Sequence, residues 1–204
     1  MPKLHRPRFG SLQFWPRKRA RKILPSVNWK PLEKKYATAT AKLLGFPCYK
    51  AGMLSVLVRD LTPFSMTKDK QIVLPCTVAE CPPVKVLAIR FYREGKTAFD
   101  LLSPSLEKEL GRKIRLPRQQ PKFEDIKERY DNIRIIVYTL VKQTAIKKTP
   151  DITEIALQGS LPEKLEAAKQ LLDKEISVED VFSKNQLVDV HGVVQRGVGL
   201  EMQV

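Results

Sequence analysis

The feature that most constrains this chain is its first thirty residues, which carry nine Lys or Arg and no Asp or Glu. Five of these cations fall within the six positions Arg17–Lys22. Residues that break regular structure interrupt the stretch at Pro2, Pro7, Gly10, Pro16 and Pro25. A segment that repels itself and is broken by proline cannot build a core of its own. It can become ordered against a polyanion that neutralises it, so we expect a nucleic acid as its partner.

Four large aromatic residues lie among these cations, namely Phe9, Phe14, Trp15 and Trp29. Aromatic rings can stack on bases while Arg side chains grip phosphates. A cationic tail can also serve as a solubility tail or a localisation address, but neither role requires four large rings. We therefore interpret residues 1–40 as an extended, basic, RNA-binding arm.

The charge of the chain is concentrated in this arm. The net charge is +15, yet the 174 residues after Lys30 hold 28 basic and 22 acidic side chains, so the body is only mildly basic. Hydrophobic residues make up 43% of the 204 residues, which is enough for one substantial domain or one domain with an insertion. The asymmetry predicts an anionic partner that is held mainly by the arm.

Secretion and membrane insertion are not expected. The three cysteines are an odd number and no apolar stretch follows the charged N-terminus, which together favour a reducing cytosol. The longest apolar run, Ile135–Val141, has seven residues, far fewer than the roughly 20 needed to cross a bilayer. We expect a cytoplasmic protein without a membrane partner.

Runs rich in β-branched and apolar residues predict five strands. They lie at Met53–Arg59, Ile72–Ala79, Val84–Tyr92, Arg134–Val141 and Leu187–Val194. The fourth is apolar at nearly every position, which predicts burial on both faces.

Helices are predicted between the third and fifth strands. One begins at Ser103-Pro104 and runs to Leu110, with Gly111 as the stop signal, and another covers Phe123–Tyr130. The strongest follows the capping box Ser160–Glu163 and has one apolar face. That face consists of Leu161, Leu165, Ala168, Leu172 and Ile176. Ser177 is expected to cap a further short turn.

Strands early and late with helices between them predict an α+β fold. We expect an incomplete β-barrel with an inserted α/β lobe and the extended basic arm. The barrel strands would come from 41–92 and 185–204, and the lobe from 93–184.

No arrangement of residues indicates catalysis, a metal site or a cofactor. His5 lies in the arm, and His191 alternates with valines on a strand, which is typical of a core or rim histidine. Cys76 and Cys81 form one loose pair with Cys48 far away in sequence, and zinc sites need more ligands than that. Buried reduced cysteines are the expected outcome.

Four segments resemble a known family and occur in the family's order. They are His5–Ala20, Phe46–Met53, Glu80–Val86 and Leu187–Val193. The first is similar to an Arg-Pro-Arg-x-Gly-Ser-Leu-x-Phe-x-Pro-Arg-Lys-Arg-Ala arm, and the second to a Gly-Tyr-Lys-Ala-Gly-Met segment that leads into a strand. The chain thus resembles the N-terminal part of universal large-subunit ribosomal protein number three, in its archaeal and eukaryotic form.

The resemblance implies a structural constituent of the large ribosomal subunit, with large-subunit rRNA and neighbouring ribosomal proteins as partners. It would support subunit assembly and the architecture around the peptidyl transferase centre, where the RNA performs the chemistry, so the chain would not be an enzyme. The candidate RNA-binding residues are Arg6, Arg8, Phe14, Trp15, Arg17, Lys18, Arg19, Arg21, Lys22 and Lys50.

The family pattern continues beyond the last segment matched here, with a long RNA-penetrating loop and further barrel strands. Val194–Gly199 is only loosely similar to the family's Lys- and Gly-rich segment. A truncated gene, a gene split in two or a frame change near Arg196 would each give this pattern, and if the gene is split, a second polypeptide is expected to supply the remaining strands. Two other functions stay open: a barrel enzyme that the basic arm localises, and a module that binds an acidic protein.

Overall fold

The computed structural model describes residues 24–36, 41–115, 117, 129–192 and, as backbone, 199–203. These residues form an α+β fold in which strands predominate and helices are short. The elements, in chain order, are α1 (Lys30–Lys35), β1 (Gly45–Arg59), β2 (Gln71–Glu80), β3 (Val84–Arg93), β4 (Lys96–Leu102), the 3-10 helix η2 (Lys108–Arg112), β5 (Asn132–Thr139), the 3-10 helix η4 (Val141–Gln143), β6 (Ile152–Ala156), α2 (Leu161–Leu171), β7 (Glu175–Ile176), α3 (Val178–Val181), β8 (Asp189–Gly192) and β9 (Gly199–Gln203).

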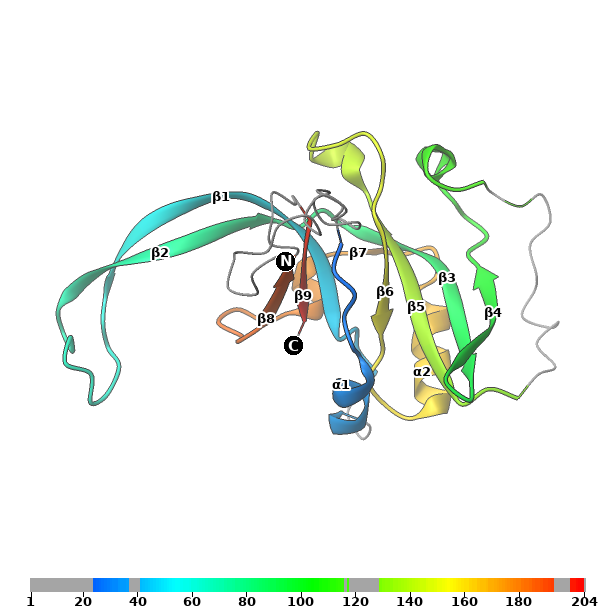
Figure 1. Cartoon of the computed structure of the whole chain (residues 1–204), viewed down its shortest axis with the longest axis horizontal. Helices are drawn as coiled ribbons and strands as arrows, with labels where there is room; N and C mark the ends of the chain where they lie inside the picture. The colour runs from blue at the N-terminus through cyan, green and yellow to red at the C-terminus, as the bar shows by residue number, and fades with distance from the viewer. Residues whose placement is uncertain (1–23, 37–40, 116, 118–128, 193–198, 204) are drawn as a thin grey trace, which may run out of the picture.

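The strands build two antiparallel sheets. The first has the order β2-β1-β9-β8, and its β1–β2 hairpin extends away from the rest of the chain (Figure 1). The second has the order β4-β3-β5-β6, with β7 paired to β3. Neither sheet closes on itself within the part of the chain that the structure describes.

The two sheets meet near the start of β1. Leu43 forms an isolated bridge with Leu157, and the Leu44 amide donates to the Ala156 carbonyl at 3.0 Å. The strand β3, which was expected among the barrel strands, forms hydrogen bonds with β4 and β5. It therefore shares a sheet with strands of the segment 93–184, which was expected to form the lobe. The division into arm, barrel strands and lobe stays a prediction.

The core lies on both faces of β5. Because side chains alternate along a strand, Ile133, Ile135 and Val137 pack into the larger apolar cluster, while Ile136 and Tyr138 pack into a second one. Helix α2 covers part of the first cluster through Ala168. The predicted burial of this strand on both faces is confirmed.

All five predicted strands are present, and Ser160 and Ser177 both begin helices through capping boxes. The structure ends α2 at Leu171 rather than continuing it to Ile176. Ile176 instead lies in β7, opposite Val84, where it is buried in the larger cluster. The apolar residue expected on the helix face is therefore buried by a strand.

The helix predicted from Ser103 to Leu110 is wrong. Ser103 is fully buried and its hydroxyl donates to Asp173 at 2.9 Å, so it does not cap a helix, and only the 3-10 helix η2 forms farther on. The sequence patterns also gave no indication of the strands β4, β6, β7 and β9. Most of the helix expected at Phe123–Tyr130 falls outside the described residues, and Tyr130, which is described, is not helical.

Within the described ranges, no helix is both long and apolar enough to span a membrane. The same residues contain no group of three or more His, Cys, Asp or Glu placed to hold a metal ion.

Candidate nucleic-acid interface

Most of the arm that the sequence proposes as an RNA ligand lies outside the described residues. This applies to nine of the ten candidates, Arg6, Arg8, Phe14, Trp15, Arg17, Lys18, Arg19, Arg21 and Lys22. The tenth, Lys50, is exposed on β1 beside the register shift between Lys50 and Gly52. The position of Lys50 leaves its charge accessible to a phosphate.

The last part of the expected arm is docked on the body. Pro31 lies in the first turn of α1, where its missing N–H and fixed φ are tolerated. Trp29 precedes this helix, is only 3% exposed and donates its indole N–H to the Glu154 carbonyl at 2.9 Å. The expectation that Trp29 belongs to an extended arm that stacks on bases is wrong, because its ring is part of the core.

A network of charged side chains holds α1 against the second sheet. Arg134 on β5 donates to Glu33 at 2.8 and 3.1 Å and to Glu154 at 3.0 Å. Arg90 on β3 makes a bidentate contact with Asp100 at 2.7 Å and reaches Glu154 at 3.2 Å. We call these five residues the ion-pair network. Its two cations face three acids, so it has no positive charge left to offer an anion.

Burial and charge act against each other at Glu33. Burial alone would raise the pKa of the Glu33 carboxyl, but hydrogen bonds and attraction from Arg134, with a further hydrogen bond from Asn132, hold that pKa below its ordinary value. Glu33 therefore stays ionised at neutral pH. The network fixes the segment that directly follows the basic arm.

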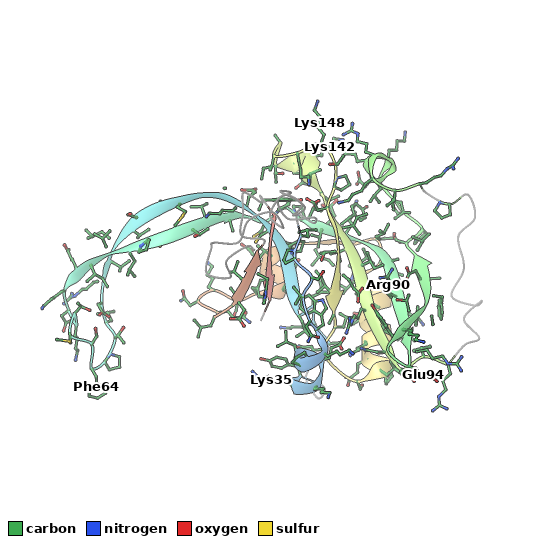
Figure 2. The ribbon with its side chains drawn as sticks, viewed as in Figure 1. Lys35, Phe64, Arg90, Glu94, Lys142 and Lys148 are labelled. Carbon is green, nitrogen blue, oxygen red and sulfur yellow. The ribbon has the colours of Figure 1, made fainter. Side chains whose placement is uncertain are left out.

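A second group of charged side chains is not balanced in this way. It comes from two segments, 107–115 around η2 and 141–151 after β5, which together hold seven cations and three acids. We call its cations the two-loop patch; they are Lys108, Arg112, Lys113, Arg115, Lys142, Lys147 and Lys148. Figure 2 shows Lys142 and Lys148 projecting from the end of the fold, away from the sheets.

Direct contacts join the two segments of the patch. The Arg112 guanidinium donates to the Lys148 carbonyl at 2.8 Å, and the Lys113 ammonium donates to Asp151 at 3.1 Å. Beneath them, Leu110 is fully buried in the second apolar cluster with Leu140 and Tyr138. The same packing that buries Leu110 of η2 thus brings the cations of the segment 107–115 beside those of the segment 141–151.

Asp151 is the buried acid that organises the patch. Its side chain is 5% exposed and accepts hydrogen bonds from Lys113, Lys147 and the Tyr49 hydroxyl, the last at 2.7 Å. Burial would raise the pKa of Asp151, but the hydrogen bonds from Lys147, Tyr49 and Lys113 outweigh burial and lower it. Burial also raises the pKa of Tyr49, which therefore remains a hydrogen-bond donor at neutral pH.

The patch suits a polyanion. Its exposed members include Lys108, Arg112, Lys142 and Lys148, and Lys and Arg side chains of this kind bind phosphates without reading base sequence. The sequence alone does not indicate these residues as a site, because the two segments are about thirty residues apart and each is only a modest basic run. The positive charge of the two segments was the one signal in the sequence, because no local sequence pattern indicates that these segments lie side by side.

Comparison with known proteins gives a consistent result over the whole chain. A family model described as ribosomal protein L3 matches residues 1–114 and residues 91–204. The large ribosomal subunit protein uL3 of Methanocaldococcus jannaschii is 37% identical over 213 residues, covering 98% of this chain and 62% of that protein.

Two further relatives carry the same description, large ribosomal subunit protein uL3. The protein of Archaeoglobus fulgidus is 36% identical, with 98% of this chain and 61% of the relative covered. That of Methanothrix thermoacetophila is 38% identical, with 96% and 60% covered. The chain thus spans about three fifths of the length of these curated relatives.

Proposed function

The chain belongs to the ribosomal protein L3 family, and from that premise we propose that it is a structural constituent of the large ribosomal subunit that binds large-subunit rRNA. The observation that carries the proposal on the body is the two-loop patch, whose two segments hold seven cations and three acids. The arm adds eight cations and no acid within residues 1–23. Both are suited to phosphate, which dominates affinity for nucleic acids.

In this proposal the protein works in the cytoplasm as a scaffold and not as an enzyme. The arm binds rRNA through Arg6, Arg8, Arg17 and the cations that follow, with Phe14 and Trp15 stacking on bases. Lys50 and the two-loop patch hold the body against RNA, and neighbouring ribosomal proteins complete the surroundings. Fixing RNA segments relative to one another supports subunit assembly and the architecture around the peptidyl transferase centre.

The structure sharpens the test of the arm. Residues 1–23 can be removed while Trp29 and α1, which are packed on the body, are kept. The full chain should bind a transcript of archaeal large-subunit rRNA with an affinity that falls about 10³–10⁵-fold between 50 and 200 mM salt, if roughly 6–10 phosphates are neutralised. The truncated chain should bind more weakly and with a shallower salt dependence, and its thermal unfolding should be unchanged.

A variant and a second ligand serve as controls for this test. A full-length variant with Phe14 and Trp15 changed to Ala keeps every cation, so it should lose affinity while keeping the salt slope. A polyglutamate ligand of matched charge tests the rival function of binding an acidic protein. Equal affinity for polyglutamate and rRNA, or an unchanged affinity after removal of residues 1–23, would contradict the proposal.

We further propose that β1 and β2 belong to a barrel completed by strands of the family fold outside the matched region. Support comes from apolar side chains that the described residues leave uncovered on this hairpin, including Met53, Leu57 and Val73, each more than 60% exposed. A second polypeptide is one candidate source of those strands. Co-expression with the C-terminal two fifths of the Methanocaldococcus jannaschii relative should protect the hairpin amides from hydrogen exchange; unchanged exchange would contradict closure.

A further inference from the structure

Two cysteines that are far apart in sequence face each other at the junction of the two sheets. The last pair of the β1–β2 ladder is Tyr49 with Glu80, and Cys48 directly precedes Tyr49 while Cys81 directly follows Glu80, so the two cysteines flank the end of this ladder. Spacing along the chain groups Cys81 with Cys76 and leaves Cys48 apart. In the folded chain, Cys81 therefore contacts Cys48, although Cys76 is nearer to Cys81 in sequence.

The geometry of this position suits a disulfide. Directly opposed residues of antiparallel strands point to the same face, with Cα atoms about 4.5–5.5 Å apart. Disulfides span Cα separations of about 4.4–6.8 Å. The side chains of Cys48 and Cys81 are in hydrogen-bonding contact, and all three cysteines of the chain are reduced.

The two thiols differ in access to solvent. Cys48 is 1% exposed on β1 in the first sheet, whereas Cys81 is half-buried directly after the end of β2. The hydrogen bond with the Cys48 thiol, which outweighs the effect of burial, lowers the pKa of Cys81. Because the thiolate is the reactive form, Cys81 is the group that an external oxidant meets first.

We propose that Cys48 and Cys81 are an oxidation site, at which hydrogen peroxide converts the two thiols into an intramolecular disulfide. The Cys81 thiolate attacks one peroxide oxygen, the O–O bond breaks, and the sulfur becomes a sulfenic acid as water leaves after protonation. The Cys48 sulfur then attacks the Cys81 sulfur, the S–O bond breaks and a second water leaves. The two thiols lose two electrons in total, and hydrogen peroxide is reduced to two waters.

The position of this site gives the bond a structural effect. Tyr49, next to Cys48, donates to Asp151, which also binds Lys113 and Lys147 of the two-loop patch. The Pro83 carbonyl, two residues after Cys81, accepts from the Leu140 amide at 2.9 Å. The disulfide would tie these two anchor points together and close the chain from Cys48 to Cys81. A loop of that length should raise the Tm by about 5–10 °C.

The experiment uses the full chain. Reduced protein is freed of reductant, treated with a small excess of hydrogen peroxide, alkylated and digested, and the peptides are identified by mass spectrometry. A peptide linking Cys48 to Cys81 is expected, together with the rise in Tm and its reversal by dithiothreitol. The same bond is expected in Cys76→Ser, which leaves the junction untouched and removes the third thiol.

Three outcomes would overturn the proposal: a bond that includes Cys76, a disulfide between two chains, or alkylation of both Cys48 and Cys81 after treatment with peroxide. Cys81→Ser, at the half-buried position, should abolish the linked peptide and the rise in Tm. Because Cys76→Ser leaves both proposed partners intact, the test does not depend on replacing the fully buried Cys48. None of these readouts involves RNA, so failure here is distinct from failure of the proposed function.

Discussion

The ion-pair network and the two-loop patch are both rich in Arg or Lys, yet they are suited to opposite tasks. In the network, Arg90 and Arg134 are enclosed by Glu33, Asp100 and Glu154, with atoms 2.7–3.2 Å apart. In the patch, the seven cations lie on two segments, and the one buried acid of these segments is Asp151. The difference shows that a cation's neighbours, more than its presence, decide whether it can bind an anion.

Desolvation explains the contrast. Arg134 and Glu33 have side chains only 15% and 10% exposed, so each needs the other to offset the loss of water. Lys108, Lys142 and Lys148 are exposed and stay hydrated until a phosphate replaces the water. The network therefore contributes to the stability of the body, and the patch remains available for a ligand.

The largest effect is expected from Arg134→Ala. Removing this guanidinium leaves the partly buried Glu33 without its main partner and takes one of two arginine partners from Glu154, which should lower the free energy of unfolding by about 3–5 kcal/mol. Urea unfolding measures this loss. Arg59→Ala is the matched control, because the Arg59–Asp69 pair at 3.3 Å is exposed on both sides and should contribute little. Similar losses in the two variants would remove the distinction drawn between the network and exposed charge.

A smaller effect on stability is expected at Asp151. Because the folded-state pKa of Asp151 is lowered, its contribution is fully present above the unfolded value of about 3.9 and is lost as pH falls through the folded pKa. Asp151→Asn should lower the free energy of unfolding by about 2 kcal/mol at pH 7, since charged hydrogen bonds to Lys113 and Lys147 are weakened. Its stability should also depend less on pH below about 4.

Urea unfolding at several pH values, with the exposed Asp189→Asn as control, measures both effects of Asp151→Asn. The control should follow the unmodified protein throughout. A variant at Asp151 that matched the control would show that the patch does not depend on this carboxylate.

The smallest expected change in free energy is in RNA binding by the patch. Changing Lys108, Lys142 and Lys148 together to Gln should weaken binding to large-subunit rRNA about tenfold, or about 1.4 kcal/mol, without affecting the fold. The slope of log affinity against log salt should become shallower by about 1 for each phosphate that is no longer neutralised.

The matched control for this triple variant changes Lys68, Lys70 and Lys96 to Gln. All three are exposed and lie near hairpin turns, so the control removes the same charge elsewhere on the body. Equal losses of affinity in the two triple variants would mean that net charge alone determines binding.

Local signals predicted five strands, which correspond to β1, β2, β3, β5 and β8, but not the other four strands of the described residues. The apolar run at 134–141 identified β5, and the Ser160–Glu163 capping box identified the start of α2, because both depend on residues close in sequence. Prediction failed where a distant partner decided the outcome. The Ser103 hydroxyl donates a hydrogen bond to Asp173 and does not cap a helix. Trp29, which was expected in the arm, lies in the core, where its indole N–H donates to the backbone carbonyl of Glu154.

The same distinction between neighbouring and distant residues applies to the candidate sites. Cations of the arm were recognisable because they are consecutive, whereas those of the patch come from segments that meet only when η2 packs over the second apolar cluster. The Cys48–Cys81 contact likewise follows from strand register, which the spacing of cysteines along the chain does not reveal.

The order of residues alone established the concentration of positive charge at one end, the apolar periods of the main strands and the segments that resemble the family. Each of these is a property of neighbouring residues. Folding in three dimensions settled which cations are neutralised, which loops share a surface and which cysteines meet. Those outcomes depend on which side chains lose water together, and that is determined when distant strands pair and pack.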